Sequence, residues 1–101
     1  MEVQKQISED GKVLTIILSG RFDITSHRSF SDAYKDKADS VSKFIVDMTD
    51  AEYLDSSALG MLLMLREHAG GEDADICVIN MTPGVKKIFQ TANFDKLFKT
   101  E

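Results

Sequence analysis

The chain has 101 residues, and its formal net charge is −5. Hydrophobic residues make up 43% and charged residues 29%, which is typical of a folded domain and not of a disordered chain. We therefore expect a single domain over residues 1–101, with one modest core and little room for an enclosed substrate cavity. The scattered Lys and Arg residues of an acidic chain do not favour a nucleic acid as the main partner.

The single cysteine, Cys77, lies in the apolar run "ICVIN", so it cannot form an internal disulfide and is expected in the core. The N-terminus shows no basic segment followed by an apolar one, as a signal peptide would. No apolar stretch approaches the roughly 20 residues that cross a bilayer. We expect a cytoplasmic protein with no membrane partner.

The first elements are a hairpin and a helix. Residues 1–7 alternate apolar with polar residues and residues 12–20 are β-branched, so both ranges predict strands, with a turn at "EDG". A helix is expected after "GRFD", where Thr25 or Ser26 can cap its N-terminus. The residues at helical spacing are Phe30, Ala33, Tyr34 and Lys37.

The second half alternates strands with helices. Strands are predicted at residues 42–48 and 74–81, and a helix at residues 56–69 that ends at two glycines. A last helix begins with Thr82 as cap and Pro83 in the first turn. Its inward residues are expected to be Val85, Ile88 and Phe89, and "FDKLFKT" is either an edge strand or a frayed tail. This order favours an α/β fold with a mixed sheet of about four to five strands and crossover helices mainly on one face.

The helix at residues 56–69 opens with Asp55, Ser56 and Ser57 and is then almost wholly apolar. Such a helix is either largely buried or exposes one side to a binding partner. The predicted inward stripe is Leu59, Leu62 and Leu63, while Met61 and Met64 fall partly outside it and suit either the core or a binding surface.

The start of this helix has two interpretations. Asp55 or Ser56 can cap it, because the first backbone N–H groups of a helix lack partners. The helix N-terminus would also bind a phosphate on Ser56 favourably. Such a phosphate would add a charge near −2 beside Asp50, Glu52 and Asp55.

Catalytic chemistry finds little support. Ser56 and His68 are twelve residues apart on one helix, roughly 18 Å, so His68 cannot serve as its base. His27, His68 and Cys77 show no metal-ligand spacing, and "GGED" follows a helix where a phosphate-binding loop would precede one. We expect no enzymatic activity, no metal and no cofactor.

Four segments together resemble the STAS domain family, in particular its anti-sigma factor antagonists. "YLDSSALGMLL" resembles the run that opens the family's second helix, and "GRFD" matches its Gly-x-x-Asp after the second strand. "IVDMTDAEYLDSS" is similar to its strand, acidic loop and phosphorylated serine, and "TPGVKKIFQTANF" to its third helix. The resemblance covers nearly the whole chain and implies the STAS fold.

The resemblance also implies roles for single residues. Ser56 matches the phosphorylated serine, and Asp23 matches an acidic residue that contacts the kinase. Two departures are Ala58, where the family has glycine, and the short C-terminus, which implies that the last helix is short or absent. The expected partner-binding residues are Asp23, Asp55, Ser57, Ala58, Gly60, Met61 and Met64.

The function implied by the resemblance is a phosphorylation-controlled switch in bacterial partner switching. The unmodified chain would bind an anti-sigma factor or related serine protein kinase that uses ATP, phosphorylation of Ser56 would release it, and a PP2C-like serine phosphatase would restore it. The alternative is a STAS subunit without regulatory phosphorylation in a larger assembly, such as a lipid transporter or a stress-sensing complex. A small hydrolase or nucleotide-binding module is a third class with less support.

Overall fold

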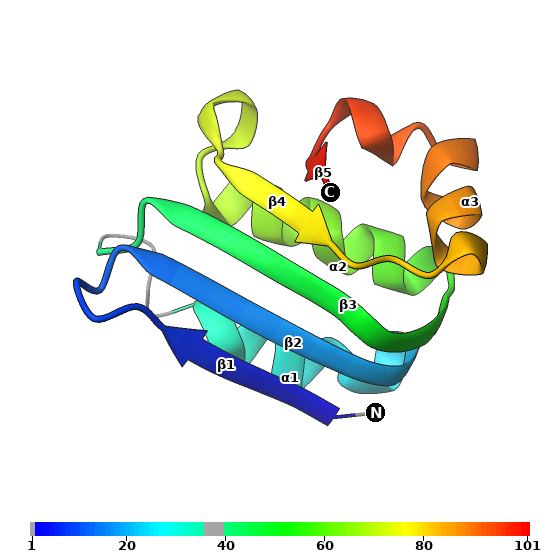
Figure 1. The fold of residues 1–101 in the computed structure, drawn as a ribbon, viewed down its shortest axis with the longest axis horizontal. Helices are drawn as coiled ribbons and strands as arrows, with labels where there is room; N and C mark the ends of the chain where they lie inside the picture. Colours follow the sequence, from blue (N-terminus) through cyan, green and yellow to red (C-terminus); the bar gives the residue numbers. More distant parts are fainter. Residues whose placement is uncertain (1, 36–39) are drawn as a thin grey trace.

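The computed structural model describes residues 2–35 and 40–101. Within these residues the strands are β1 (Glu2–Ile7), β2 (Val13–Phe22), β3 (Lys43–Leu54), β4 (Ile76–Ile79) and β5 (Lys99–Thr100). They form one sheet in the order β1-β2-β3-β4-β5 (Figure 1). β1 is antiparallel to β2, and the other neighbours are parallel. The predicted mixed sheet is confirmed.

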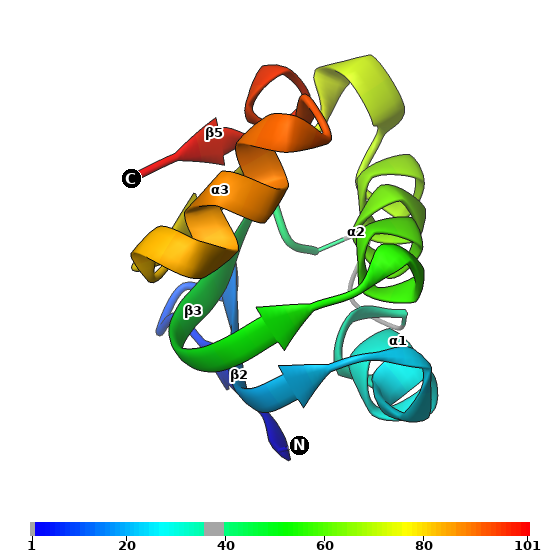
Figure 2. The same cartoon turned by 90° about the vertical axis from the view of Figure 1, so that its right-hand side faces the viewer.

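Three helices connect the parallel strands: α1 (His27–Tyr34), α2 (Ser56–His68) and α3 (Pro83–Thr91). Because the strands follow their chain order across the sheet, every right-handed crossover brings its helix to the same face. Figure 2 shows α1 and α2 side by side on that face, with α3 near the carboxyl end of β3. The prediction of helices mainly on one face is confirmed.

Alternation along β2 and β3 decides which side chains enter the core. Leu14, Ile16 and Leu18 of β2 are fully buried, while the residues between them are only partly buried. The same pattern in β3 buries Phe44 and Val46. Apolar burial of this kind stabilises by about 25 cal/mol per Å² and holds the helices on this face. From α2 the buried residues are Ala58, Met61, Leu62 and Leu65.

The predicted inward stripe of α2 is partly wrong. Leu62 is buried as expected, but Leu59 is only partly buried and Leu63 is 38% exposed. The helix is turned so that Met61 and Leu65 share the core face with Leu62. A segment that is apolar around most of its circumference carries little periodic signal, so its rotation is set by tertiary contacts.

β2 and β3 are longer than predicted. β2 continues to Phe22 and β3 to Leu54, and their pairing shifts register twice, between Ile17 and Ser19 and between Gly20 and Arg21. Bulges of this kind bend a strand without ending it. The acidic segment 49–54, expected as a loop, therefore belongs to β3 and leads directly to Asp55. β4 is shorter than its predicted range.

The predicted cap of the first helix is correct in position and not in mechanism. Ser26 stands at the N-cap position of α1, but its side chain makes no capping hydrogen bond. Instead, the carboxylate of Asp23 accepts a hydrogen bond from Thr25 N at the start of a 3-10 turn, Ile24–Ser26, that precedes α1. The predicted helical position Lys37 lies outside the described residues.

The predicted cap of the last helix is confirmed. The hydroxyl oxygen of Thr82 accepts a hydrogen bond from Val85 N, and Pro83 stands in the first turn of α3. Proline fits there because its missing N–H would have no partner within the helix.

Three phenylalanines close the core at the C-terminal end. The rings of Phe89, Phe94 and Phe98 have centroids 5.5 to 5.8 Å apart. After α3 the described chain forms only a three-residue 3-10 turn, Phe94–Lys96, and then β5. The end of "FDKLFKT" therefore forms an edge strand, which was one of its two predicted interpretations. The aromatic cluster covers the core there.

Candidate phosphorylation and partner-binding site

The loops that follow β2 and β3 meet at one edge of the sheet. Phe22 and Leu54 are paired neighbours at the ends of these parallel strands. Asp23 and Asp55 each come one residue later, so the topology brings the two predicted carboxylates to the same edge. The carboxyl ends of parallel strands are the usual location of functional residues in α/β folds.

Asp55 caps α2. Its Oδ1 accepts a hydrogen bond from Ala58 N at 2.9 Å and one from Ser57 Oγ at 2.6 Å. The Ser57 hydroxyl, followed by the Ala58 N–H, holds the pKa of the Asp55 carboxyl below its ordinary value. The capping interpretation of Asp55 is thus confirmed, and the cap is a charged carboxylate.

Ser56 occupies the first position of α2 and is exposed. Within the described residues its hydroxyl has no hydrogen-bond partner, unlike that of Ser57, which donates to Asp55. The two adjacent serines therefore differ in accessibility: one hydroxyl is held by a carboxylate and the other faces solvent. The first turn of a helix also favours negative charge.

Asp23 is fixed by its own loop. Its Oδ1 accepts hydrogen bonds from the backbone N and the hydroxyl of Thr25, at 3.0 and 2.5 Å. The next residue, Ile24, is 63% exposed, which is unusual for a large apolar side chain in a small domain. At the end of β3, Tyr53 is also exposed, and the Arg21 guanidinium lies 4.5 Å from its ring centroid.

Ile24 and Tyr53 were not predicted as site residues. The available signal was an isoleucine in the polar run "DITSH" and a tyrosine in an acidic segment. Both flank the loops that carry Asp23 and Asp55, and they add apolar contact area to this edge.

Two predicted partner-binding side chains are corrected, since Ala58 is fully buried and Met61 is 3% exposed. Both point into the core, so neither side chain can contact a partner. By contrast, Met64 is 50% exposed. A Cβ added at Gly60 would meet no atom within 4 Å, which shows that this side of the helix is open. Ser56, Gly60 and Met64 are spaced by four residues and form what we call the outer stripe of α2.

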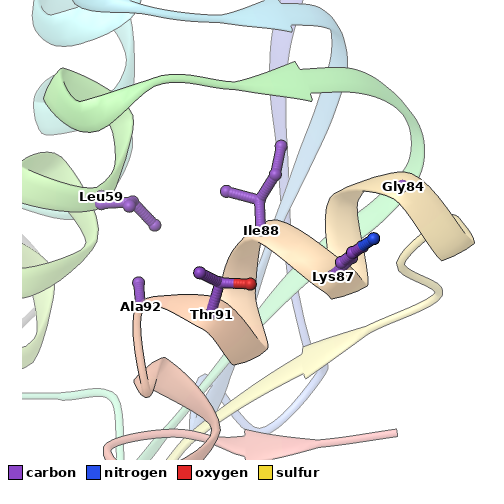
Figure 3. Close-up of a pocket in the computed structure, with 6 residues that line it drawn as sticks. All are labelled: Leu59, Gly84, Lys87, Ile88, Thr91 and Ala92. Atoms are coloured by element: carbon purple, nitrogen blue, oxygen red, sulfur yellow. The ribbon is translucent and has the colours of Figure 1, made fainter.

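A groove lies between α2 and α3 and has a volume of about 420 Å³. Figure 3 shows Leu59 of α2 facing Ile88 and Ala92, with Lys87 at the side. Ile88 was predicted to point inward with Val85 and Phe89, but it is only partly buried and lines this groove. The complete lining is Leu59, Gly84, Lys87, Ile88, Thr91 and Ala92.

The remaining histidine and cysteine side chains lie elsewhere. The His68 ring packs on Tyr34 at 5.0 Å between centroids, at the far end of α2 from Ser56. Cys77 is buried as predicted, and burial raises the pKa of its thiol. In residues 2–35 and 40–101 no three His, Cys, Asp or Glu side chains gather as a metal site would require. In the same ranges no helix is long and apolar enough to span a membrane.

The chain belongs to the STAS domain family. A family model described as "Mlab, STAS domain" matches residues 6–99. A STAS-domain containing protein of Pseudomonas aeruginosa (strain UCBPP-PA14) is 53% identical over 92 residues, which is 91% of both chains.

Solved structures agree on the fold. The anti-sigma factor antagonist SpoIIAA in its unphosphorylated form aligns with a TM-score of 0.83 at 18% identity, over 99% of this chain and 88% of that one. The Bacillus SpoIIAA in its phosphorylated form aligns with a TM-score of 0.68 at 18% identity, over 99% and 91%. The chain therefore has a SpoIIAA-like STAS fold, as the sequence resemblance implied.

Proposed function

We propose that the protein is a phosphorylation-controlled, anti-sigma factor antagonist-like switch in which Ser56 carries the phosphate. The observation that carries this proposal is the difference between the two serines: Ser56 is exposed at the first position of α2, while Ser57 is held by Asp55 at 2.6 Å. A kinase needs a hydroxyl that is free to attack a phosphoryl group. That a fold relative is known in unphosphorylated and phosphorylated forms supports the proposal.

The unmodified surface docks on an anti-sigma factor or related serine kinase that binds ATP. Its apolar part comprises Met64 on the outer stripe of α2 and Ile24 and Tyr53 beside the two loops. Its acidic part comprises Asp23 and Asp55. An apolar centre with charged residues around it is the usual composition of a protein interface. ATP and metal belong to the kinase and to a PP2C-like phosphatase, and this chain has no catalytic role.

Phosphorylation ends the complex through charge. A phosphate on Ser56 adds about −2 next to the ionised Asp55, which already caps the helix. Buried in an interface, that charge is unfavourable to desolvate unless the partner supplies a basic group. A penalty of about 3 to 4 kcal/mol weakens binding several hundred-fold. The domain itself does not need to refold, and we expect the exchange to take place in the cytoplasm.

A second candidate is a fixed subunit of a larger assembly, such as a lipid transporter. The matching family model is described as Mlab, and the apolar groove between α2 and α3 lies one turn from Ser56. In that case a partner helix or segment covers the groove permanently, and Ser56 is never modified.

The two candidates differ in one experiment. Wild type, Ser56→Ala and Ser56→Asp are used to capture partners from a lysate of the native host, with Ser57→Ala as a control for loss of a neighbouring hydroxyl. The switch predicts that an ATP-binding kinase is retained by Ser56→Ala and Ser57→Ala and lost by Ser56→Asp, with phosphate on Ser56 of the wild type. Identical partners for all four proteins and an unmodified Ser56 would support the fixed subunit.

A further inference from the structure

No helix of the described part of the chain lies on the sheet face opposite α1 and α2. Figure 1 views the molecule from this side, with β2, β3 and β4 in front of the helices. We call it the open face. Its central side chains alternate with the buried ones, and register places Ile17 beside Asp47 and Ile45 beside Cys77. The central residues are Val13, Thr15, Ile17, Lys43, Ile45, Asp47 and Ile79, while Cys77 in the same row as Ile45 is buried.

This face is more apolar than an uncovered sheet face requires. Val13, Ile17, Ile45 and Ile79 lie on three adjacent strands, are partly exposed, and are β-branched residues that pack well on a pleated surface. Where one face of a sheet meets water, polar residues usually alternate with the buried ones. Asp47 stands between Ile17 and Ile79 in the register, and the β-branched residues surround it and Ile45. β-Branched side chains on the exposed side of three adjacent strands are typical of a face that packs on another layer.

β3 places one charge of each sign on the open face, and Glu101 lies close enough to Cys77 to act on its thiol. Lys43 and Asp47 lie on the same face of β3, one on each side of Ile45, and about 13 Å apart at the usual strand rise. Asp47 is held by Thr49, whose backbone N and hydroxyl donate to it at 2.9 and 2.6 Å. At the edge of the sheet, Lys99 is already paired with Asp75 at 3.1 Å.

We propose that two copies of this chain dock through their open faces, with the β3 strands crossing antiparallel about a twofold axis at Ile45. In this arrangement Lys43 of one copy faces Asp47 of the other, and the contact occurs twice by symmetry. Ile45 meets Ile45 on the axis, and Val13 meets Ile17. Parallel stacking would instead oppose Lys43 to Lys43, which is unfavourable. The charge pattern therefore selects both the second copy and its direction.

The dimer leaves the opposite side of each domain free. α2 and its outer stripe, including Ser56, lie with the helices on the other face of the sheet. The dimer would therefore present two Ser56 sites pointing away from each other. Its formation depends only on the sheet register and the charges of the open face, and not on phosphorylation of Ser56.

The test is sedimentation equilibrium of the full chain over a wide concentration range. The wild type is expected to rise from the monomer mass of 11.3 kDa to twice that value. Lys43→Glu places an acidic side chain opposite Asp47 of the other copy in both symmetry-related contacts. This variant should weaken dimerisation about tenfold or more, and Lys43→Glu combined with Asp47→Lys should restore it. Arg28→Glu, the same charge change at an exposed position of α1, is the control and should leave the dimer unchanged.

A cross-link tests the geometry independently of Asp47, whose replacement disturbs the Thr49 contacts. In a Cys77→Ser background, Thr15→Cys lies in register with Ile45 on the axis and should form an intermolecular disulfide under mild oxidation. Gln90→Cys, exposed on α3, should not. A wild type that remains a monomer throughout, a Lys43→Glu variant that dimerises as the wild type does, or equal cross-linking of the two cysteine variants would overturn the proposal.

Discussion

The hydroxyl of Ser57 lies 2.6 Å from Oδ1 of Asp55, and this bond divides the two adjacent serines into a structural one and an accessible one. The same oxygen also accepts from Ala58 N at 2.9 Å, so a single carboxylate fixes the first turn of α2. The start of the helix is therefore capped without any contribution from the Ser56 side chain.

Asp55→Ala is expected to lower the free energy of unfolding by about 1 kcal/mol, the usual cost of losing an N-terminal cap. Asp55→Asn should lower it less, because an amide oxygen still accepts from Ala58 N. Urea denaturation at neutral pH measures both. Equal stability of Asp55→Ala and wild type would show that the capping contacts contribute nothing.

Low pH should remove the stabilisation of the fold that depends on the ionised Asp55 carboxylate. The Ser57 hydroxyl and then the Ala58 N–H lower the pKa of Asp55 from its ordinary 3.8, so the folded state binds this proton more weakly than the unfolded state. The stabilisation is therefore fully present above the ordinary pKa and is lost as the pH falls through the lower folded value.

The measurement is the difference in free energy of unfolding between wild type and Asp55→Asn at several pH values. We expect a constant difference above about pH 5 and a smaller one below the ordinary pKa. Taking the difference cancels the contributions of Asp10 and Asp47, whose pKa values are also lowered. The Ser8 hydroxyl lowers the pKa of Asp10. Burial raises the pKa of Asp47, but hydrogen bonds from Thr49 outweigh it and lower the pKa overall. A difference that does not change with acid would contradict an ionised cap.

Much of this fold follows from local sequence signals. Alternation along residues 12–20, the cap and proline at Thr82 and Pro83, and the two glycines after α2 are short-range features that physical rules interpret directly. The extension of β3 to Leu54 could not be predicted in this way, because it depends on pairing with β2 across two register shifts.

The positions of the polar residues of the candidate site could be predicted from the sequence, and those of its apolar residues could not. Asp23, Asp55 and Ser56 stand at helix starts, where side-chain chemistry is informative. The apolar part depends on how each helix is rotated against the sheet, which decides that Met61 is buried and that Ile88 lines the groove. An almost uniformly apolar helix does not encode that rotation in its own periodicity.

The two methionines of α2 offer a matched pair. Met61 is in the core and Met64 on the outer stripe, so Met61→Ala should cost about 2 to 5 kcal/mol of unfolding free energy. Met64→Ala should stay within about 0.5 kcal/mol of wild type. Chemical denaturation measures both, and comparable losses for the two variants would contradict the observed rotation of α2.

Partner binding should depend on Met64, although this residue contributes little to stability. Met64→Glu, at an exposed position that tolerates a charge, should weaken capture of the proposed kinase because it adds that charge to the outer stripe of α2. Gln90→Glu adds the same charge on exposed α3, so it serves as the control and should bind as wild type does. Undiminished capture by Met64→Glu would remove the outer stripe from the interface.

Phosphorylation itself should distinguish the two serines. Because the Ser57 hydroxyl donates to Asp55 while the Ser56 hydroxyl is exposed, a captured kinase with Mg-ATP should modify wild type and Ser57→Ala, and should not modify Ser56→Ala. Intact-mass and peptide mass spectrometry measure the phosphate and its position. Ser57→Ala also removes one hydrogen bond to Asp55. A change in the rate at which this variant is phosphorylated on Ser56 would therefore show that the cap affects the reaction. Phosphate on Ser57 in the wild type would mean that the bond to Asp55 opens in the kinase complex, and the switch would then act by breaking the cap.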